Sequence, residues 1–263
     1  MHGQPVLRQG MGLYNRYRVT EGVLTYKFDE KCGNRKEMIG MGNNISIAID
    51  GPAGAGKSTI AKLVAKKLGF IYVDTGAMYR AMAVHFLREG ILAEETEKIE
   101  AACEGVSVTI RYENNEQQVI LNGENVTHLL RTEEVGKMAS ASSVVPKVRL
   151  KLVELQRKLA ATANVVMDGR DIGTYVLPDA QVKIYMTAGI RERALRRFEE
   201  LKQKGIECNL DEIEKDIAER DYRDMNRDFA PLRQAEDAVY LDTSCMSFEE
   251  VADEVGRIAA SVK

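Results

Sequence analysis

Short apolar runs, separated by longer segments with helical periodicity, organise the chain from Asn44 onward. Five runs are rich in β-branched residues, which is typical of strands buried on both faces of a parallel sheet. They cover residues 45–50, 70–74, 164–168, 182–186 and 238–242. Between them apolar residues recur every three or four positions, which predicts helices at 57–68, 76–89, 94–103, 131–143, 146–162, 189–204, 210–228 and 247–261. This alternation predicts an α/β fold with a doubly wound, five-stranded parallel sheet whose ligands bind at the carboxyl ends of the strands.

One segment breaks the alternation. Residues 107–112 (SVTIRY) alternate between apolar and polar positions, residues 118–121 (QVIL) form a short apolar run, and Asn122-Gly123 follows them. This pattern predicts antiparallel strands with polar turns, within an insertion covering about residues 105–130. Two interpretations are open: a decorative hairpin on one edge of the core, or a mobile lobe that closes on a substrate.

The first 43 residues show no sustained periodicity. Their four acidic residues argue against a transit peptide, because such peptides contain few acidic residues. We expect a disordered N-terminal extension, or a start codon placed upstream of a true start at Met41, and a functional arm is the alternative. The remaining residues, 44–263, are expected to form one domain.

Composition narrows the class of protein. Hydrophobic residues make up 44% of the 263 positions, which is enough for a sizeable core. No apolar run is long enough to span a membrane, and no secretory signal is present at the N-terminus. A formal net charge of −3 argues against a nucleic-acid coat. The four cysteines contain no CxxC pair, so we expect reduced thiols and a cytoplasmic protein. They are Cys32, Cys103, Cys208 and Cys245.

A glycine-rich loop lies between the first strand and the first helix. Residues 51–58, GPAGAGKS, match the pattern G-x-x-x-x-G-K-[ST] at every fixed position. Glycines let such a loop turn its backbone N–H groups toward phosphate oxygens, and the helix N-terminus adds a positive dipole. Lys57 is expected to reach the β- and γ-phosphates, and the Ser58 hydroxyl to ligate Mg²⁺. The predicted ATP-binding residues are Gly51, Pro52, Ala53, Gly54, Ala55, Gly56, Lys57, Ser58 and Thr59.

Charged clusters follow the predicted strands. DTGAMYR (74–80) follows the second strand, and DGRDIG (168–173) follows the third. In the helix predicted at 210–228, an apolar stripe at helical spacing continues into Arg220, Asp224 and Arg227. Burying such charges costs several kcal/mol unless they are paired or meet a ligand. The stripe therefore predicts the wall of a binding pocket, and a surface ion pair between Arg220 and Asp224 is the alternative.

The helix predicted at 189–204 carries a second group of charges. Arg193, Arg196 and Arg197 are spaced at i, i+3 and i+4. They indicate either a solvated face balanced by glutamates or a set of cations that fold over a triphosphate.

Taken together, these motifs resemble the bacterial cytidylate kinases, which are P-loop nucleoside monophosphate kinases. The resemblance rests on GPAGAGKST, DTGAMYR, ASASSVVPKVR, MDGRDIGT and ERDYRDMNRDFAPL, in this order, over some 220 residues from Ile45 onward. The first 43 residues lie outside it. The insertion is similar to the extra β segment in the monophosphate-binding lobe of that family, and the Arg-rich stretch at about 188–208 to its lid.

The resemblance implies ATP-dependent phosphorylation of CMP and dCMP by direct in-line transfer, in pyrimidine nucleotide metabolism. It implies Mg²⁺ as cofactor, held directly by Ser58 and through water by Asp168. The catalytic residues that we expect are Lys57, Arg170, Arg193, Arg197 and Arg227. The CMP-binding residues implied by the resemblance are Thr75, Tyr79, Arg80, Ser140, Arg149, Arg170, Asp171, Arg220, Asp224 and Arg227. Among these, Ser140, Arg149 and Asp171 are assigned to the cytosine base.

Three other classes fit parts of the pattern. A P-loop GTPase switch would carry an N/T-K-x-D motif, which the sequence lacks. A kinase for another small acceptor suits the P-loop equally well, and only the family-specific motifs argue against it. The net charge of −3 and the absence of a stretch of mixed aromatic and basic residues argue against a nucleic-acid-binding ATPase. We expect a monomer, by analogy with small monophosphate kinases.

Overall fold

The computed structural model describes residues 17–20, 23–26, 44–113 and 116–261, and divides into two units, Met1–Gly40 and Met41–Lys263. In the first unit, β1 (Tyr17–Thr20) and β2 (Val23–Tyr26) pair as antiparallel strands. This pair differs from our expectation that regular structure begins only at Asn44. Two strands of four residues are too short for their alternation to stand out in a periodicity. The prediction of a disordered extension concerns residues that otherwise lie outside the described ranges, and it stays a prediction.

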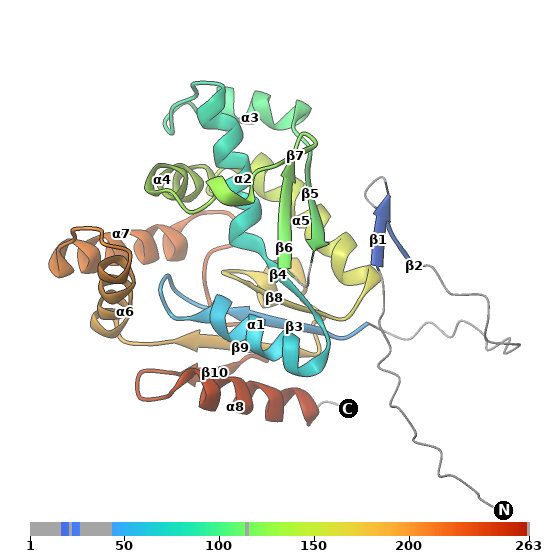
Figure 1. Cartoon of the computed structure of the whole chain (residues 1–263), viewed down its shortest axis with the longest axis vertical. Helices are drawn as coiled ribbons and strands as arrows, with labels where there is room; N and C mark the ends of the chain where they lie inside the picture. Colours follow the sequence, from blue (N-terminus) through green and yellow to red (C-terminus); the bar gives the residue numbers. More distant parts are fainter. Residues whose placement is uncertain (1–16, 21–22, 27–43, 114–115, 262–263) are drawn as a thin grey trace, which may run out of the picture. The chain divides into compact units, whose positions relative to one another are not determined.

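The second unit is built on a five-stranded parallel sheet (Figure 1). Its strands are β3 (Ser46–Asp50), β4 (Ile71–Asp74), β8 (Val165–Gly169), β9 (Val182–Thr187) and β10 (Val239–Asp242). They are ordered β10-β9-β3-β8-β4. Each lies within one residue of the predicted run at either end, which confirms the predicted sheet. The expectation that every strand is buried on both faces is wrong for β10, an edge strand in which Val239 and Tyr240 are 42% and 56% exposed. From β3 the chain passes to β4 and β8 on one side of it, and then crosses to β9 and β10 on the other side. The carboxyl end of β3 is therefore the switch point, where such folds bind ligands.

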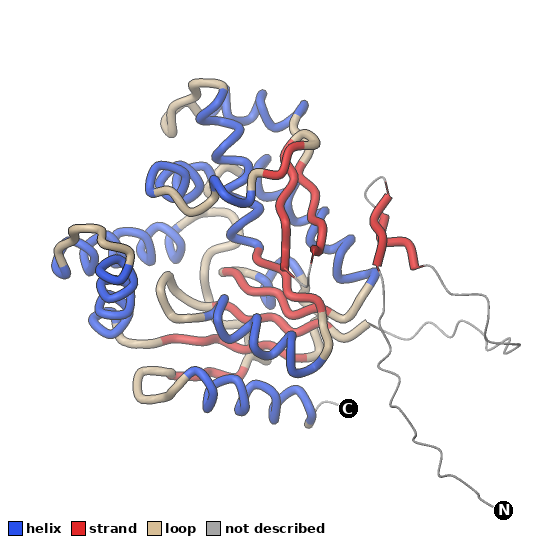
Figure 2. The backbone as a smooth tube through the Cα atoms, in the orientation of Figure 1, coloured by secondary structure: helices blue, strands red, loops and turns tan. Residues whose placement is uncertain are grey.

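Helices cover both faces of this sheet, and the colouring in Figure 2 shows the strands as a layer between them. α1 (Lys57–Leu68) and α8 (Phe248–Ala260) pack on one face. α2 (Thr75–Arg88) and α5 (Pro146–Thr162) pack on the other. Side chains of β3 alternate between the two faces. Ile47 and Ile49 belong to the core under α1 and α8, whereas Ala48 belongs to the core under α2 and α5.

The predicted insertion is a small antiparallel sheet beside α2. It consists of β5 (Val108–Glu113), β6 (Glu116–Leu121) and β7 (Glu124–Asn125). The short β7 was not predicted. Asn122 and Gly123 both have positive φ, 48° and 89°, which is the geometry of a two-residue hairpin turn between β6 and β7. The flanking elements are α3 (Thr96–Gly105), η1 (Thr127–Leu129) and α4 (Glu133–Ser142).

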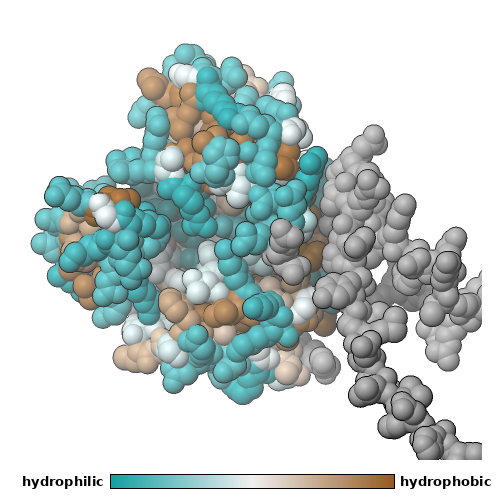
Figure 3. Space-filling model, in the orientation of Figure 1, coloured by the Kyte–Doolittle hydropathy of each residue, from teal (hydrophilic) through white to brown (hydrophobic). Residues whose placement is uncertain are grey.

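Two further helices project from the sheet in Figure 1. They are α6 (Ile190–Gln203) and α7 (Leu210–Asn226), and a single turn of π-helix, η2 (Ile172–Val176), follows β8. The surface of α6 and α7 is mostly hydrophilic, as is the hollow beside them (Figure 3). Among the described residues, no helix is both long and apolar enough to cross a membrane.

Candidate active site

The glycine loop lies at the carboxyl end of β3 and leads into α1. Gly51 has a φ of 149°, and a Cβ atom there would lie 1.9 Å from the Met186 carbonyl oxygen of β9. Gly56 is the N-cap of α1 and has a left-handed conformation, with a φ of 85°. Larger residues at both positions would strain or displace the backbone, so the glycines fix the loop against the sheet.

Lys57 is buried at the start of α1. Its Nζ donates a hydrogen bond of 2.6 Å to the carbonyl oxygen of Pro52, across the loop. Burial lowers the pKa of Lys57 well below its usual range, and the nearby Arg170 lowers it further. The ammonium group is thus held inside the loop, where an arriving phosphate oxygen can replace the Pro52 carbonyl as its acceptor.

Ser58 and Asp168 meet beside the loop. The Ser58 hydroxyl donates to Oδ2 of Asp168 at 2.8 Å, and the Tyr72 hydroxyl donates to Oδ1 at 2.9 Å. Burial raises the pKa of Asp168 to about 6, and the carboxylate of Asp74 adds to the shift. A hydroxyl and a carboxylate are hard oxygen donors, and Mg²⁺ is typically held by one or two such groups with substrate phosphates and waters. The residues present therefore fit this cation.

A second buried group of charges lies beyond β8. Arg149 of α5 is 1% exposed and contacts Oδ2 of Asp171 at 2.5 Å, while Arg227 contacts Oδ1 at 3.3 Å. The guanidinium of Arg149 also lies 5.5 Å from the centre of the Tyr79 ring. Burial raises the pKa of Tyr79 to about 12, against the opposing effect of Arg149. The hydroxyl of Tyr79 is therefore a neutral donor near pH 7.

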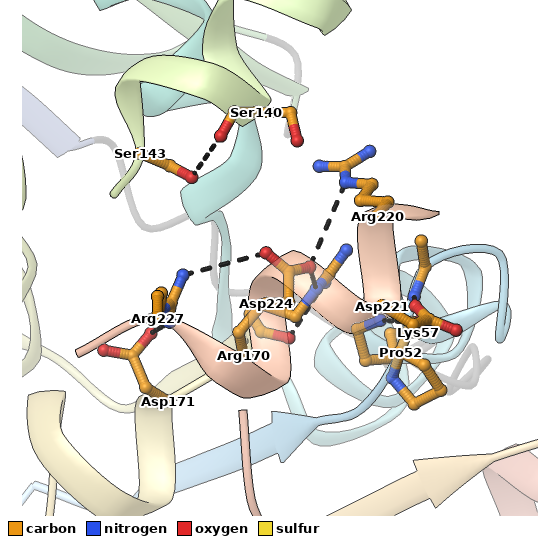
Figure 4. Close-up of polar contacts among 12 residues, drawn as sticks. Pro52, Lys57, Ser140, Ser143, Arg170, Asp171, Arg220, Asp221, Asp224 and Arg227 are labelled. Atoms are coloured by element: carbon orange, nitrogen blue, oxygen red, sulfur yellow. Dashed lines mark hydrogen bonds and ion pairs between the residues drawn. The ribbon is translucent and has the colours of Figure 1, made fainter. Parts of the chain in front are cut away.

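Asp224 of α7 is surrounded by three arginines, as Figure 4 shows. Its carboxylate lies 2.8 Å from Nε of Arg170, 3.8 Å from Nη1 of Arg227 and 4.0 Å from Nε of Arg220. Burial alone would raise the pKa of Asp224, but the arginines hold it below its usual range. Burial, together with Arg170, lowers the pKa of Arg220 to about 10. The charged end of the α7 stripe is therefore a compact cluster in which three arginines share one carboxylate, so positive charge is in excess.

These groups share one cavity of about 510 Å³. The glycine loop and Asp168 form one part of its wall, and Arg149, Asp171 and Arg227 form another. The cavity thus has a phosphate-binding loop at one side and a buried Arg–Asp pair at the other.

The match to known proteins agrees with this geometry. The family model described as cytidylate kinase matches residues 47–261. The chain belongs to the cytidylate kinase family. The cytidylate kinase of Caldicellulosiruptor saccharolyticus is 51% identical over 211 residues, which cover 80% of this chain and 93% of that protein. The cytidylate kinase of Streptococcus pneumoniae serotype 19F is 48% identical over 212 residues, 80% of this chain and 95% of that protein. This confirms the prediction of a nucleoside monophosphate kinase of this family.

Most of the residues that the sequence analysis assigned to the site line this cavity. The lining includes Ala53, Gly54, Ala55, Gly56, Lys57, Ser58, Thr59, Thr75, Tyr79, Arg80, Arg149, Asp168, Arg170, Asp171, Arg193, Arg197, Arg220, Asp224 and Arg227. Gly51 and Pro52 are not in the lining. Gly51 lies against the Met186 backbone, and the Pro52 carbonyl oxygen accepts from Lys57. Ser140 is not in the lining either. Its hydroxyl is buried without a hydrogen-bond partner among the described residues, and the neighbouring Ser143 does line the cavity.

The arginines of α6 divide between two environments. Arg193 is buried and contacts Asp221 of α7, whereas Arg197 is half-exposed and pairs with Glu200 at 2.8 Å. Arg196 donates to the carbonyl oxygen of Thr243 at 2.9 Å. The Arg197–Glu200 pair fits the interpretation of a solvated face balanced by glutamates, and the interpretation that the arginines fold over a triphosphate stays a prediction.

Several lining residues were missed by the sequence reasoning. Arg131 lies 3.5 Å from Asp74, and Phe248 lies at the start of α8. Asp221 is not in the lining, but it is buried and pairs with Arg193, which is. Its position four residues after Ile217 and three before Asp224 was a signal for Asp221, whereas no spacing in the sequence links Arg131 or Phe248 to the site.

Proposed function

We propose that this chain transfers the γ-phosphoryl group of ATP to CMP or dCMP, giving ADP and the nucleoside diphosphate. An oxygen of the CMP phosphate attacks the γ-phosphorus in line, and the bond from that phosphorus to the β–γ bridging oxygen breaks. The observation that carries the proposal is the single cavity that joins a phosphate-binding loop to the buried Arg149–Asp171 pair. Membership of the cytidylate kinase family supports the same reaction.

The Arg149–Asp171 pair suits a cytosine base. A carboxylate accepts from the N4 amino group of cytosine, and a guanidinium donates to its O2 and N3 edge. Uracil carries an oxygen at position 4, which would face the Asp171 carboxylate as a second acceptor and leave it unpaired. Ser140 is proposed as a further member of this subsite; its hydroxyl is buried outside the cavity lining and has no hydrogen-bond partner among the described residues.

Arginines surround the position proposed for the acceptor phosphate. Arg80, Arg170, Arg220, Asp224 and Arg227 all line the cavity. Arg80, Arg170 and Arg227 are proposed to bind the CMP phosphate, and Arg220 and Asp224 the pentose and phosphate end. Thr75 lies at the start of α2 and donates to the Asp168 carbonyl oxygen at 2.6 Å. Because the acceptor phosphate is already anionic, positioning and charge neutralisation carry the catalysis, and no strong general base is needed.

On the donor side, residues 51–59 are proposed to hold ATP. Lys57 would donate to the β- and γ-phosphates, and Arg193 and Arg197 would neutralise charge on the transferring group. Ser58 is proposed to ligate Mg²⁺ directly and Asp168 to orient waters on it. When bound, Mg²⁺ supplies charge neutralisation and orientation of the donor phosphates.

We propose further that the enzyme works as a cytoplasmic monomer in pyrimidine nucleotide metabolism and binds no nucleic acid. The monomer is proposed by analogy with small monophosphate kinases. The free thiols of Cys103, Cys208 and Cys245 support a reducing compartment.

An acceptor panel tests the reaction. The protein is incubated with ATP, Mg²⁺ and one of CMP, dCMP, UMP, AMP or GMP, and the ADP formed is measured. We expect CMP and dCMP to be the best acceptors. Strong activity with AMP or GMP alone would overturn the proposal and favour a kinase for another acceptor.

The base-reading role of Asp171 gives a sharper prediction. In Asp171→Ala, the cytosine amino group loses its acceptor and Arg149 loses its main partner. We expect KM for CMP to rise by about tenfold or more, with KM for ATP changed by less than about threefold, because one charge-assisted hydrogen bond contributes about 1.5–3 kcal/mol. Steady-state kinetics measure both constants, and the exposed Asp179→Ala is the control. An equal loss of ATP affinity would contradict the assignment.

A further inference from the structure

Asp221 is a buried carboxylate that the reaction described above does not use. It lies on α7 and is 7% exposed. Its Oδ1 accepts a hydrogen bond of 2.9 Å from the backbone N–H of Ala53 in the glycine loop, and its Oδ2 accepts one of 2.5 Å from Nη1 of Arg193 on α6. Figure 4 shows Asp221 beside Pro52 and Lys57. One side chain therefore joins the glycine loop to both projecting helices.

The guanidinium of Arg193 is held on three sides. Its Nε donates to the Ala188 carbonyl oxygen at 2.9 Å, and its Nη1 donates both to Asp221 and to the Ala53 carbonyl oxygen at 2.8 Å. Nη2 has no hydrogen-bond partner among the described residues, and Arg193 lines the cavity. A guanidinium has five N–H donors in a rigid plane, so fixing Nε and Nη1 also fixes the direction of Nη2.

Charge explains why a carboxylate occupies this position. Arg170 and Arg220 also line the cavity, so an unpaired Arg193 would meet repulsion as well as the cost of burial. Asp221 neutralises Arg193 and constrains it at once. Asp224, one helical turn further along α7, has the same relation to Arg170.

We propose that Asp221 is a positioning residue, which holds Arg193 against Ala53 of the glycine loop so that Nη2 of Arg193 faces the phosphoryl group in transfer. Asp221 itself does not contact the substrate. The inference rests on the proposed function for the presence of ATP in the loop, and it does not depend on which monophosphate is the acceptor.

The test compares Asp221→Asn, Arg193→Met and the double variant. Asp221→Asn keeps the shape of the side chain but removes the charge that orients Arg193. We expect kcat to fall by about 10- to 100-fold, because a small misplacement of a catalytic group costs about this much. KM for ATP and for CMP should change by less than about threefold. Arg193→Met should lose at least as much kcat, and the double variant should lose no more than Arg193→Met.

Asp211→Asn is the matched control. Asp211 pairs with Arg191 at 3.0 Å, so this variant also breaks an Asp–Arg pair between α7 and α6, but both side chains are largely exposed and lie outside the cavity lining. We expect unchanged kcat. Asp221→Glu is measured as well, since it keeps the charge and displaces the carboxylate by one methylene. Asp221→Glu should lower kcat without changing KM. This variant provides the test if Asp221→Asn does not fold.

Three results would overturn the inference. The losses of kcat in Asp221→Asn and Arg193→Met could multiply in the double variant, which would show that the residues act independently. KM for ATP could rise at unchanged kcat, which would show that Asp221 only supports the loop through Ala53. Asp211→Asn could match the loss in Asp221→Asn. If the wild type prefers another acceptor, the proposed function fails, and the same comparison with that acceptor still tests Asp221.

Discussion

The buried charged residues in and around this cavity form pairs or small groups of arginines and aspartates. Asp171 accepts from Arg149 and Arg227, Asp224 lies among three arginines, and Asp221 holds Arg193. Breaking a buried pair by removing one partner costs about 3–5 kcal/mol, because a charge is left without compensation. Variants in this cluster therefore need a measurement of stability beside each measurement of rate.

Lys57 gives the first prediction at this scale. Lys57→Ala removes the ammonium that donates across the glycine loop to Pro52 and that is proposed to donate to the transferring phosphate. We expect turnover to fall by a factor on the order of 10²–10³, comparable to the loss of one preorganised donor. Steady-state kcat with CMP and ATP measures the effect. Lys66→Ala, on the exposed side of the same helix, should keep wild-type turnover, and wild-type turnover in Lys57→Ala would exclude Lys57 from the mechanism.

The sequence predicts residues whose chemistry is encoded by spacing, and it misses those that only the fold brings together. The glycine loop is local, so its function can be read from eight consecutive positions. The partners Asp74 and Arg131, by contrast, are 57 positions apart. Asp221 lies four residues after Ile217 and three before Asp224, so helical spacing already places it on the buried face of α7. What the sequence does not encode is its pairing with Arg193 of α6 and with the backbone of Ala53 in the glycine loop.

Elements were predicted best where burial is continuous. The central strands β3, β8 and β9 are mostly buried and have uninterrupted apolar runs, so their boundaries could be predicted to within one residue. The edge strand β10 is largely exposed, and its short apolar sequence alone allowed the same accuracy. The pair β1 and β2, the two-residue β7 and the π-helical turn η2 were not predicted. Each is too short for a periodicity, and η2 depends on a distant contact: Asp50 at the end of β3 accepts from the backbone N–H groups of Ile172 and Gly173 at 2.8 and 2.7 Å.

That contact between β3 and η2 predicts a pH dependence of stability. Burial raises the pKa of Asp50 to about 7, against the two backbone hydrogen bonds, and Asp171 adds to the rise. The folded protein then binds the proton more tightly than the unfolded chain. The contribution of the protonated Asp50 to stability is thus complete below the unfolded pKa, about 4, and is lost as the pH rises through about 7.

We therefore expect the free energy of unfolding of the wild type to fall, relative to that of Asp50→Asn, as the pH rises from about 5 to about 7. The slope is at most about 1.4 kcal/mol per pH unit for one proton. Urea denaturation of both proteins at several pH values measures the difference, and a constant offset from the altered hydrogen bonds does not affect the slope. A difference that is the same at every pH would contradict the prediction.

The whole molecule divides into a kinase unit and a preceding segment. The contacts separate Met1–Gly40 from Met41–Lys263, and the family model begins at residue 47. All lining residues of the cavity lie in the second unit.

A protein that starts at Met41 is therefore expected to keep the kcat and KM values of the full chain to within about twofold, because no residue of the cavity or of either core is removed. A protein that starts at Ile49 is the negative control, since it removes most of β3 from the centre of the sheet. Steady-state kinetics and thermal melting of the full chain and of the two shortened proteins test this prediction. A large loss of activity on starting at Met41 would indicate a functional arm.

The helices α6 and α7 differ from the others in what fastens them. Among the described residues, neither core cluster includes a side chain from either helix, whereas Arg193, Asp221 and Asp224 are buried there. Two apolar side chains of these helices, Ala194 and Ile217, are buried, and ion pairs and hydrogen bonds join the helices to the glycine loop and to Arg170. Nucleotides are polyanions that compete for the same guanidinium groups. Nucleotide binding and the attachment of α6 and α7 therefore depend on the same arginines. A substitution of Asp221 or Asp224 is expected to alter both.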